Sequence, residues 1–469
     1  MAANRFTRNL SANTVQLLIN QAFGLLIFFA LSKGLDKNIF GELNWCLAVL
    51  LAAFGILSFG IDQVLVKKIA AGYNRQSVFN AYLFHVITCG SIFYCLLLLL
   101  YLAAPRLIPY QSLLLLIGIG KLGIFFSSPL KQLAAGLEKF DLLLFMSVTS
   151  NIVRGTTLLV VWMLQSMSVT HVLVIFIAGD LLELLLCIFI ARPLLGASYE
   201  FKRNRRIQWV LLKESLPQTG VVVFTAIMSR LDWILVGLFV SSIKLAEYSF
   251  AWKAFEVSTL PLLVIAPLMI PLFTRLQKLP GNIHGLSFFL EWQIIVASLT
   301  ALLLNVCWTP IIDFITDGKY GAVNASTIFL LSLAIPILYF NNYLWTINFS
   351  RGNLKRIFFT MGVSFAVNII ACSILIPLRK NEGAAIAYLI TLLVQMGLYL
   401  QKSSSLSLGK WYFLCRWPLA ACITGILVKS FSVNMMTATL LATAIYAALV
   451  FASRQVRFKN WETLQSLYQ

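Results

Sequence analysis

The chain has 469 residues, of which 60% are hydrophobic and only 11% are charged. Its mean hydropathy of +0.87 excludes an ordinary water-soluble domain and is typical of a polytopic helical membrane protein. The formal net charge of +19 could suggest nucleic-acid binding. The basic residues, however, are spread over the loops with a bias that a membrane topology explains, so no nucleic-acid partner is expected.

Apolar stretches of about 20 residues, the length that a membrane-spanning helix needs, recur along the whole chain. About fourteen spans are predicted, centred near residues 21, 52, 90, 120, 153, 182, 225, 260, 298, 334, 366, 391, 420 and 443. The first stretch follows the polar segment MAANRFTRNL and lacks a small-residue cleavage site, so it is predicted to be a span rather than a signal peptide. The predicted fold class is therefore all-α, a polytopic membrane protein.

The loop charges predict the orientation. If the N-terminus is cytoplasmic, the cytoplasmic segments hold about three times as many Lys and Arg residues as the outer segments. Both termini are then cytoplasmic. The cluster FKRNRR, between the sixth and seventh spans, is best explained as an orientation signal touching anionic lipid, with specific ligand binding as the alternative.

That connection also divides the chain. The segment GELNW at the second span and the segment AEYSF at the eighth form a faint parallel repeat. It predicts an N-terminal six-helix lobe over 1–196, a C-terminal six-helix lobe over 207–402, and two additional helices with a cytoplasmic tail over 410–469. Transporters built from such halves place the substrate between them.

The chain offers little that would support an enzyme. Every loop is too short for a soluble catalytic domain, and no GxxxxGK[ST] phosphate loop occurs. The eight cysteines are scattered without a CxxC pair or a Cys/His cluster, so neither a disulfide framework nor a metal site is indicated. No cofactor is expected.

Four basic residues lie inside predicted spans: Lys121, Arg154, Arg230 and Lys253. A charge at the centre of a bilayer costs ~3 kcal/mol on insertion scales, so it persists only when it faces protein or a wet cavity. These residues predict an anion-attracting cavity. Lys121 and Arg154 support this best, because neither has an acid within a helical turn of its own span.

Two acids in the sixth predicted span, Asp180 and Glu183, lie three residues apart and share a helix face. Their charges would repel each other, so the pair needs a cationic partner or a proton. Lys121 and Arg154 are the candidate partners. A proton- or cation-responsive site and a salt-bridge network within the N-terminal half are both open at this point.

The C-terminal half has mixed charges. Lys253 and Glu256 lie three residues apart, so an ion pair competes with substrate binding for Lys253. Arg230 and Asp232 are two residues apart and point to different sides of the helix. Asp232 and Glu256 are predicted to balance charge or to couple an ion.

Polar side chains recur at helical spacing in several spans and form stripes that lipid-facing helices do not carry. They are predicted either to line the cavity or to hold helices together by hydrogen bonds. The predicted cavity members are Asn20, Asn151, Gln218 and Ser229.

Three stretches carry a resemblance to a known family: LSKGLDKNIFGELNWCLAV, SRLDWILVGLFVSSIKLAEYSFAWKAFEVSTLPLLVIAPLMIPLFTRL and IPLRKNEGAAIAYLITLLVQ. They resemble the second, the seventh-to-eighth and the eleventh-to-twelfth spans of bacterial polysaccharide flippases of the Wzx type. That group belongs to the multidrug/oligosaccharidyl-lipid/polysaccharide (MOP) exporter superfamily. The motifs are diffuse, and Ala246-Glu247-Tyr248 departs from relatives that have Gly near the Tyr.

The resemblance implies two six-helix lobes in a V around a cationic cavity. It implies alternating-access transport of an undecaprenyl-diphosphate-linked oligosaccharide across the bacterial inner membrane, from the cytoplasmic to the periplasmic leaflet, for surface polysaccharide such as O-antigen. Membrane lipids are expected partners, as are the polymerase and the chain-length regulator of the same pathway. The alternatives are a flippase for the peptidoglycan lipid precursor, a cation-coupled multidrug exporter, and a glycan polymerase or ligase.

Overall fold

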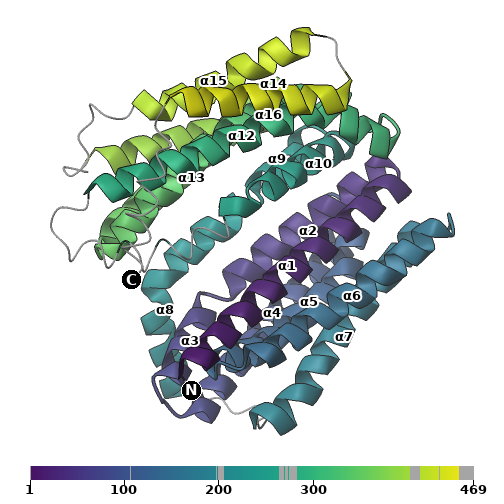
Figure 1. The fold of residues 1–469 in the computed structure, drawn as a ribbon. Helices are drawn as coiled ribbons and strands as arrows, with labels where there is room; N and C mark the ends of the chain where they lie inside the picture. The colour runs from purple at the N-terminus through teal and green to yellow at the C-terminus, as the bar shows by residue number, and fades with distance from the viewer. Residues whose placement is uncertain are drawn as a thin grey trace. The chain divides into compact units, whose positions relative to one another are not determined.

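The computed structural model describes residues 2–105, 107–196, 198, 205–262, 269, 273, 283–401, 412–431 and 434–453. Within these residues the chain consists of helices and short turns, without a strand (Figure 1). This architecture confirms the all-α fold class predicted from composition and hydropathy.

The helices have the following bounds, in chain order: α1 (Ala2–Gly34), α2 (Lys37–Leu57), α3 (Ile61–Ala70), α4 (Arg75–Ala103), α5 (Gln111–Gly136), α6 (Phe140–Met163), α7 (Val169–Leu195), α8 (Arg205–Met228), α9 (Leu231–Phe239), α10 (Ser242–Ser258), α12 (Ile283–Thr316), the 3₁₀ helix η1 (Ala322–Asn324), α13 (Ala325–Ser350), α14 (Leu354–Leu400), α15 (Tyr412–Ser430) and α16 (Met435–Ala452).

Many of these helices are suited to a membrane. Among the described residues, nine helices are long and apolar enough to cross one, and the bent α8 would add a tenth if it forms a single span. Two predicted spans, centred near residues 366 and 391, both fall within α14, whose backbone is non-helical at Lys380 (φ 52°, ψ −125°). α14 is therefore two successive helices, which supports a multi-pass chain. The total of fourteen spans stays a prediction.

The chain forms two compact units, residues 1–246 and residues 247–469, called unit 1 and unit 2 below. In unit 1, α5 is the central helix and packs against α2, α3, α4, α6 and α7, while α1 packs against α6. Small residues allow these close approaches. A Cβ atom added at Gly136 of α5, for example, would lie 2.9 Å from Cβ of Ile69 in α3.

Unit 1 also contains α8, which packs against α2 and α3, and α9, which packs against α2. α2 and α3 are separated by a break at which Phe59 (φ 50°) and Gly60 (φ 69°) adopt left-handed backbone conformations. The Thr219 hydroxyl of α8 donates a hydrogen bond to the Phe59 carbonyl (2.7 Å). Further along, the Trp45 indole donates to the Ile234 carbonyl of α9 (3.1 Å). A broken helix in an apolar environment needs such partners for its carbonyl groups.

Unit 2 is organised around α12, which packs side by side with α13, α15 and α16 (Figure 1). Two contacts show that α12 and α15 run in the same direction, and a third joins α16 to α12. The Trp417 indole donates to the Glu291 carboxylate near the start of both helices (3.1 Å), and Gly425 lies against Leu302 further along. The Tyr446 hydroxyl of α16 donates to the Ile295 carbonyl (3.1 Å).

Candidate functional site

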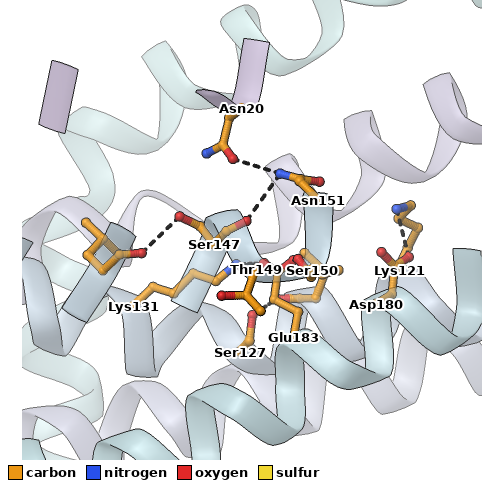
Figure 2. A network of polar contacts seen from close by, with 12 residues as sticks. Asn20, Lys121, Ser127, Lys131, Ser147, Thr149, Ser150, Asn151, Asp180 and Glu183 are labelled. Atoms are coloured by element: carbon orange, nitrogen blue, oxygen red, sulfur yellow. Dashed lines mark hydrogen bonds and ion pairs between the residues drawn. The ribbon is translucent and has the colours of Figure 1, made fainter. Parts of the chain in front are cut away.

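Five charged side chains from α5, α6 and α7 meet inside unit 1, and they are called the charge network below: Lys121, Lys131, Arg154, Asp180 and Glu183. The Lys121 ammonium lies 2.7 Å from Asp180 Oδ2, as Figure 2 shows. Arg154 forms an ion pair with Asp180 through Nη1 and lies 3.5 Å from Glu183 through Nη2. Lys131 forms an ion pair with the other oxygen of Glu183.

The two acids are the most enclosed members of the charge network. Asp180 is 0% exposed and Glu183 is 4% exposed, whereas the Lys131 side chain keeps 19% of its surface. Buried carboxylates are stable only when cations and hydrogen bonds replace the lost water. Each acid here has two cationic neighbours. Three basic and two acidic side chains give the charge network a formal excess of one positive charge.

Two glycines make room for this arrangement. A Cβ atom added at Gly179 of α7 would lie 2.2 Å from Cγ of Arg154, and one added at Gly120 of α5 would lie 2.8 Å from Oδ2 of Asp180. Neither position could carry a side chain without displacing a charged residue. These glycines therefore fix how closely α5, α6 and α7 approach around Asp180.

Hydrogen bonds extend the charge network to α1. Arg154 Nη2 donates to the Asn151 side-chain carbonyl (2.7 Å), and the Asn151 amide donates to Asn20 of α1 (2.8 Å; Figure 2). One turn away, the Gln16 amide of α1 donates to the Ser147 hydroxyl of α6 (2.8 Å). A continuous polar chain thus links the Asp180 carboxylate of α7 to the first helix.

The structure brings Lys121, Arg154, Asp180 and Glu183 together, as expected for the salt-bridge network that was one of the two hypotheses from the sequence. Lys131 was not among the predicted site residues, although its ten-residue spacing from Lys121 places both on one helix face. Ser150, whose hydroxyl donates to Glu183, was also missed. It shares the α6 face of Arg154 at a spacing of four residues, and this spacing was the available signal.

Three other predicted residues of unit 1 lie around the junction of α8 and α9. The Arg230 guanidinium lies 4.8 Å from the ring centroid of Trp233. Asp232 is 7% exposed, and its carboxylate accepts from the Trp233 backbone N–H (2.9 Å). Ser229, which directly follows α8, is exposed, and its hydroxyl donates to the Ala226 carbonyl in the last turn of that helix. The side chain of Gln218 lies outside what the structure describes.

The remaining two predicted residues belong to unit 2. The Lys253 ammonium donates to the Glu256 carboxylate at 2.8 Å, three residues further along α10. Their side chains are 17% and 33% exposed. The intrahelical ion pair that the sequence offered as a competitor to substrate binding is therefore present.

The sequence was compared with protein families and with curated proteins. The sequence profile described as "Polysaccharide biosynthesis protein" matches residues 6–277. No curated protein sequence matches the chain.

Solved structures share the fold. The lipid II flippase MurJ, in an inward closed conformation, is similar with a TM-score of 0.76 at 15% identity, over 95% of this chain and 99% of that one. The MATE transporter VcmN of Vibrio cholerae gives 0.57 at 12% identity, over 86% and 98% of the two chains. A MOP superfamily transporter from Pyrococcus furiosus gives 0.53 at 12% identity, over 91% and 96%.

At these identities the similarity establishes the fold alone, which the chain shares with MurJ, VcmN and the Pyrococcus furiosus transporter. The profile match covers more than half of the sequence and includes every helix of the charge network. The chain is therefore a multi-pass membrane protein that belongs to the polysaccharide biosynthesis protein family.

Proposed function

We propose that the chain flips undecaprenyl-diphosphate-linked oligosaccharide repeat units from the cytoplasmic to the periplasmic leaflet of a bacterial inner membrane, for surface polysaccharide such as O-antigen. Both termini are then cytoplasmic. The observation that carries the proposal is the excess positive charge buried in the charge network of a polysaccharide biosynthesis family member.

The charge network suits a diphosphate cargo. A phosphate oxygen gains strong, charge-assisted hydrogen bonds from Lys and Arg, and these are stronger in a low-dielectric interior than in water. In the observed state Asp180 and Glu183 are the counter-ions of Lys121 and Arg154 without cargo. A diphosphate would compete with the two acids for the same donors. Once the diphosphate has bound these cations, Asp180 and Glu183 would need Lys131 or protons from outside as new partners. Proton uptake at this step would couple cargo binding to an ion.

The remaining predicted residues have secondary roles in this proposal. Arg230 and Lys253 add cationic contacts to the head group, and Asp232 and Glu256 balance their charge. The amides and hydroxyls of the predicted polar stripes would bind sugar hydroxyls: Asn20, Asn151, Gln218 and Ser229. The polymerase and the chain-length regulator of the same pathway would act on the product after it has crossed.

Deletion of the gene in its native glycan pathway tests the proposal. We expect lipid-linked repeat units to accumulate on the cytoplasmic side and surface polysaccharide to disappear, with both effects reversed by the intact gene. Normal surface polysaccharide in the deletion strain would refute the proposal.

A peptidoglycan-precursor flippase is the second candidate, because the fold is similar to that of the lipid II flippase MurJ over nearly the full length. Expression of this chain in cells depleted of their own lipid II flippase separates the two candidates. Restored growth would favour lipid II, and continued lysis together with restored glycan in the deletion strain would favour the oligosaccharide. A multidrug exporter would instead raise resistance to cationic drugs and leave both lipid-linked precursors unaffected.

A further inference from the structure

Unit 2 contains a cavity that the proposed transport does not use. It has a volume of about 100 Å³, is partly open, and lies between α12, α13 and α15. All of its lining residues belong to unit 2, and they lie beyond the end of the family profile match at residue 277. α15, one of the two helices that follow the predicted six-helix lobes, forms one wall.

The cavity has a local cause in the sequence. Small residues on the facing surfaces of the three helices leave the space unfilled, among them Ala301 of α12, Ser332 of α13 and Ala421 of α15. Pro336 of α13 and Pro418 of α15 also line it. Proline removes a hydrogen bond of the helix ladder and bends the helix axis, which keeps neighbouring helices from closing together.

Most of the lining is apolar, and two of its polar side chains, Asn305 and Ser332, are hydrogen-bonded, whereas the buried Ser298 hydroxyl has no hydrogen-bond partner among the described residues. The Asn305 amide donates to the Ser332 hydroxyl and to the Ala301 carbonyl, and the Ser332 hydroxyl donates to the Phe329 carbonyl (2.7 Å). A cavity attracts ordered water when its walls offer unsatisfied polar atoms, and an apolar cavity stays dry. Because apolar side chains make up most of the wall, it favours a hydrocarbon occupant.

The cavity opens on the side where lipid would lie. Ile426 of α15 lines it and is 71% exposed, and its neighbours on the outer surface of α15, Ile423 and Leu427, are 56% and 46% exposed. Exposed aliphatic side chains on a membrane-spanning helix face lipid chains. A lipid chain could therefore enter from the bilayer without passing through water.

The length and the end of the cavity point to one kind of occupant. Its lining extends along α15 from Pro418 to Lys429, which is about 16 Å at a rise of ~1.5 Å per residue. That length is roughly half of the ~30 Å hydrocarbon thickness, the depth of one leaflet. Lys429 lies in the last turn of α15, where a lysine extends to the head-group region and attracts anionic lipid.

We propose that this cavity binds one acyl chain of an anionic phospholipid, with its phosphate held by Lys429. The site gives α15 a function of its own: the helix completes a lipid-binding wall on α12 and α13. The proposal is independent of the cargo, because no residue of the charge network takes part.

The test uses the full-length protein, purified in detergent and mixed with phosphatidylglycerol or with phosphatidylcholine of the same chains. Bound lipids are counted by native mass spectrometry. Cys422 lines the cavity and Cys415 is exposed on the same helix, so Cys422→Phe fills the site and Cys415→Phe is the matched control. We expect Cys422→Phe to lose one bound phosphatidylglycerol and Cys415→Phe to keep it.

Lys429→Gln tests the head-group contact without altering the packing of the cavity. We expect the preference for phosphatidylglycerol over phosphatidylcholine to fall about fivefold, which corresponds to ~1 kcal/mol for a lysine near an anionic head group. The exposed Lys355, in the first turn of α14, provides the control Lys355→Gln, which should keep the preference.

Two outcomes would overturn the proposal. One is equal lipid retention by the Cys422→Phe and Cys415→Phe variants together with an unchanged preference in Lys429→Gln. The other is displacement of the bound phosphatidylglycerol by undecaprenyl diphosphate at a lower concentration than by added phosphatidylglycerol, because the site would then belong to the cargo. Loss of flipping in cells would leave this proposal standing, since lipid retention is measured without transport.

Discussion

At the scale of residues, the main feature of unit 1 is a carboxylate shared by two cations. Asp180 is completely buried and contacts Lys121 from α5 and Arg154 from α6. Removing one partner of a buried ion pair leaves the other charge without compensation, which costs more than the pair itself contributes. The shared acid should therefore dominate the stability of this region.

Asp180→Asn tests this directly. The substitution keeps the shape of the side chain but leaves Lys121 and Arg154 without their common counter-ion, so we expect a loss of about 3 kcal/mol in unfolding free energy. Glu183→Gln should cost less, because its partner Lys131 retains more exposure. Thermal unfolding of the purified protein, followed by tryptophan fluorescence, measures both. The exposed Glu138→Gln serves as control and should be close to neutral.

Gly179→Ala tests whether the absence of a side chain at Gly179 of α7 is needed for Arg154 to reach Asp180. The added methyl group would lie 2.2 Å from Arg154 Cγ, so the arginine must move and weaken its contact with Asp180. We expect a destabilisation of about 2 kcal/mol, within the range for overpacking. Gly24→Ala in α1 is the matched control, since nothing lies within 4 Å of its added Cβ, and alanine should there be neutral or stabilising. Equal melting temperatures for the two variants would contradict the steric argument.

At the scale of elements, a hydrogen bond from α8 stabilises the break between α2 and α3 in unit 1. The carbonyl of Phe59 has lost its helical partner at the break between α2 and α3, and Thr219 of α8 supplies a donor. A membrane interior offers no water as a replacement. The contact between α8 and the break therefore has an energetic reason, and it places α8 with the N-terminal helices.

Thr219→Val removes that donor while keeping the shape of the side chain. We expect a loss of ~1 kcal/mol and faster amide exchange around residues 56–62, because the Phe59 carbonyl is left unpaired. Hydrogen–deuterium exchange read by mass spectrometry locates the effect. Thr225→Val is the control, since the Thr225 hydroxyl bonds only the Val221 carbonyl of its own helix among its described contacts. Equal exchange in both variants would show that the Thr219 hydroxyl does not stabilise the break.

Sequence patterns predicted some of these elements and missed others for physical reasons. Hydropathy located the helices, because an apolar run of span length has few other stable conformations in lipid. The i, i+3 spacing placed Asp180 and Glu183 on one face, and the structure confirms that both contact Arg154. Lys121 and Arg154 were the predicted partners, and the structure confirms both. Which acid each cation contacts could not be predicted, because pairing between α5, α6 and α7 depends on glycine-mediated approach in three dimensions. The break at Phe59 was not predicted, although Ser58, Gly60 and Asp62 around it interrupt the apolar run.

At the scale of the whole molecule, the open question is whether the charge network stabilises the fold or binds the cargo. Single substitutions cannot separate the two roles, because each leaves a buried charge unpaired and damages stability together with any binding. A variant that removes one cation together with its acid avoids this difficulty. Lys121→Met with Asp180→Asn keeps the network at one excess positive charge and leaves Arg154 paired with Glu183.

The double variant should recover most of the stability that Asp180→Asn loses, and the recovery measures the coupling between the two residues. If Lys121 binds the diphosphate, flipping should nevertheless stay impaired. A charge-assisted hydrogen bond contributes about 1.5–3 kcal/mol, so we expect an effect of roughly 10- to 100-fold on cargo affinity. Surface polysaccharide in the complemented deletion strain, normalised to protein in the membrane, is the measurement. Polysaccharide restored to the wild-type level would assign Lys121 and Asp180 to structural pairing. A stable but inactive protein would assign Lys121 to the cargo, since stability and net charge would both be matched to the parent chain.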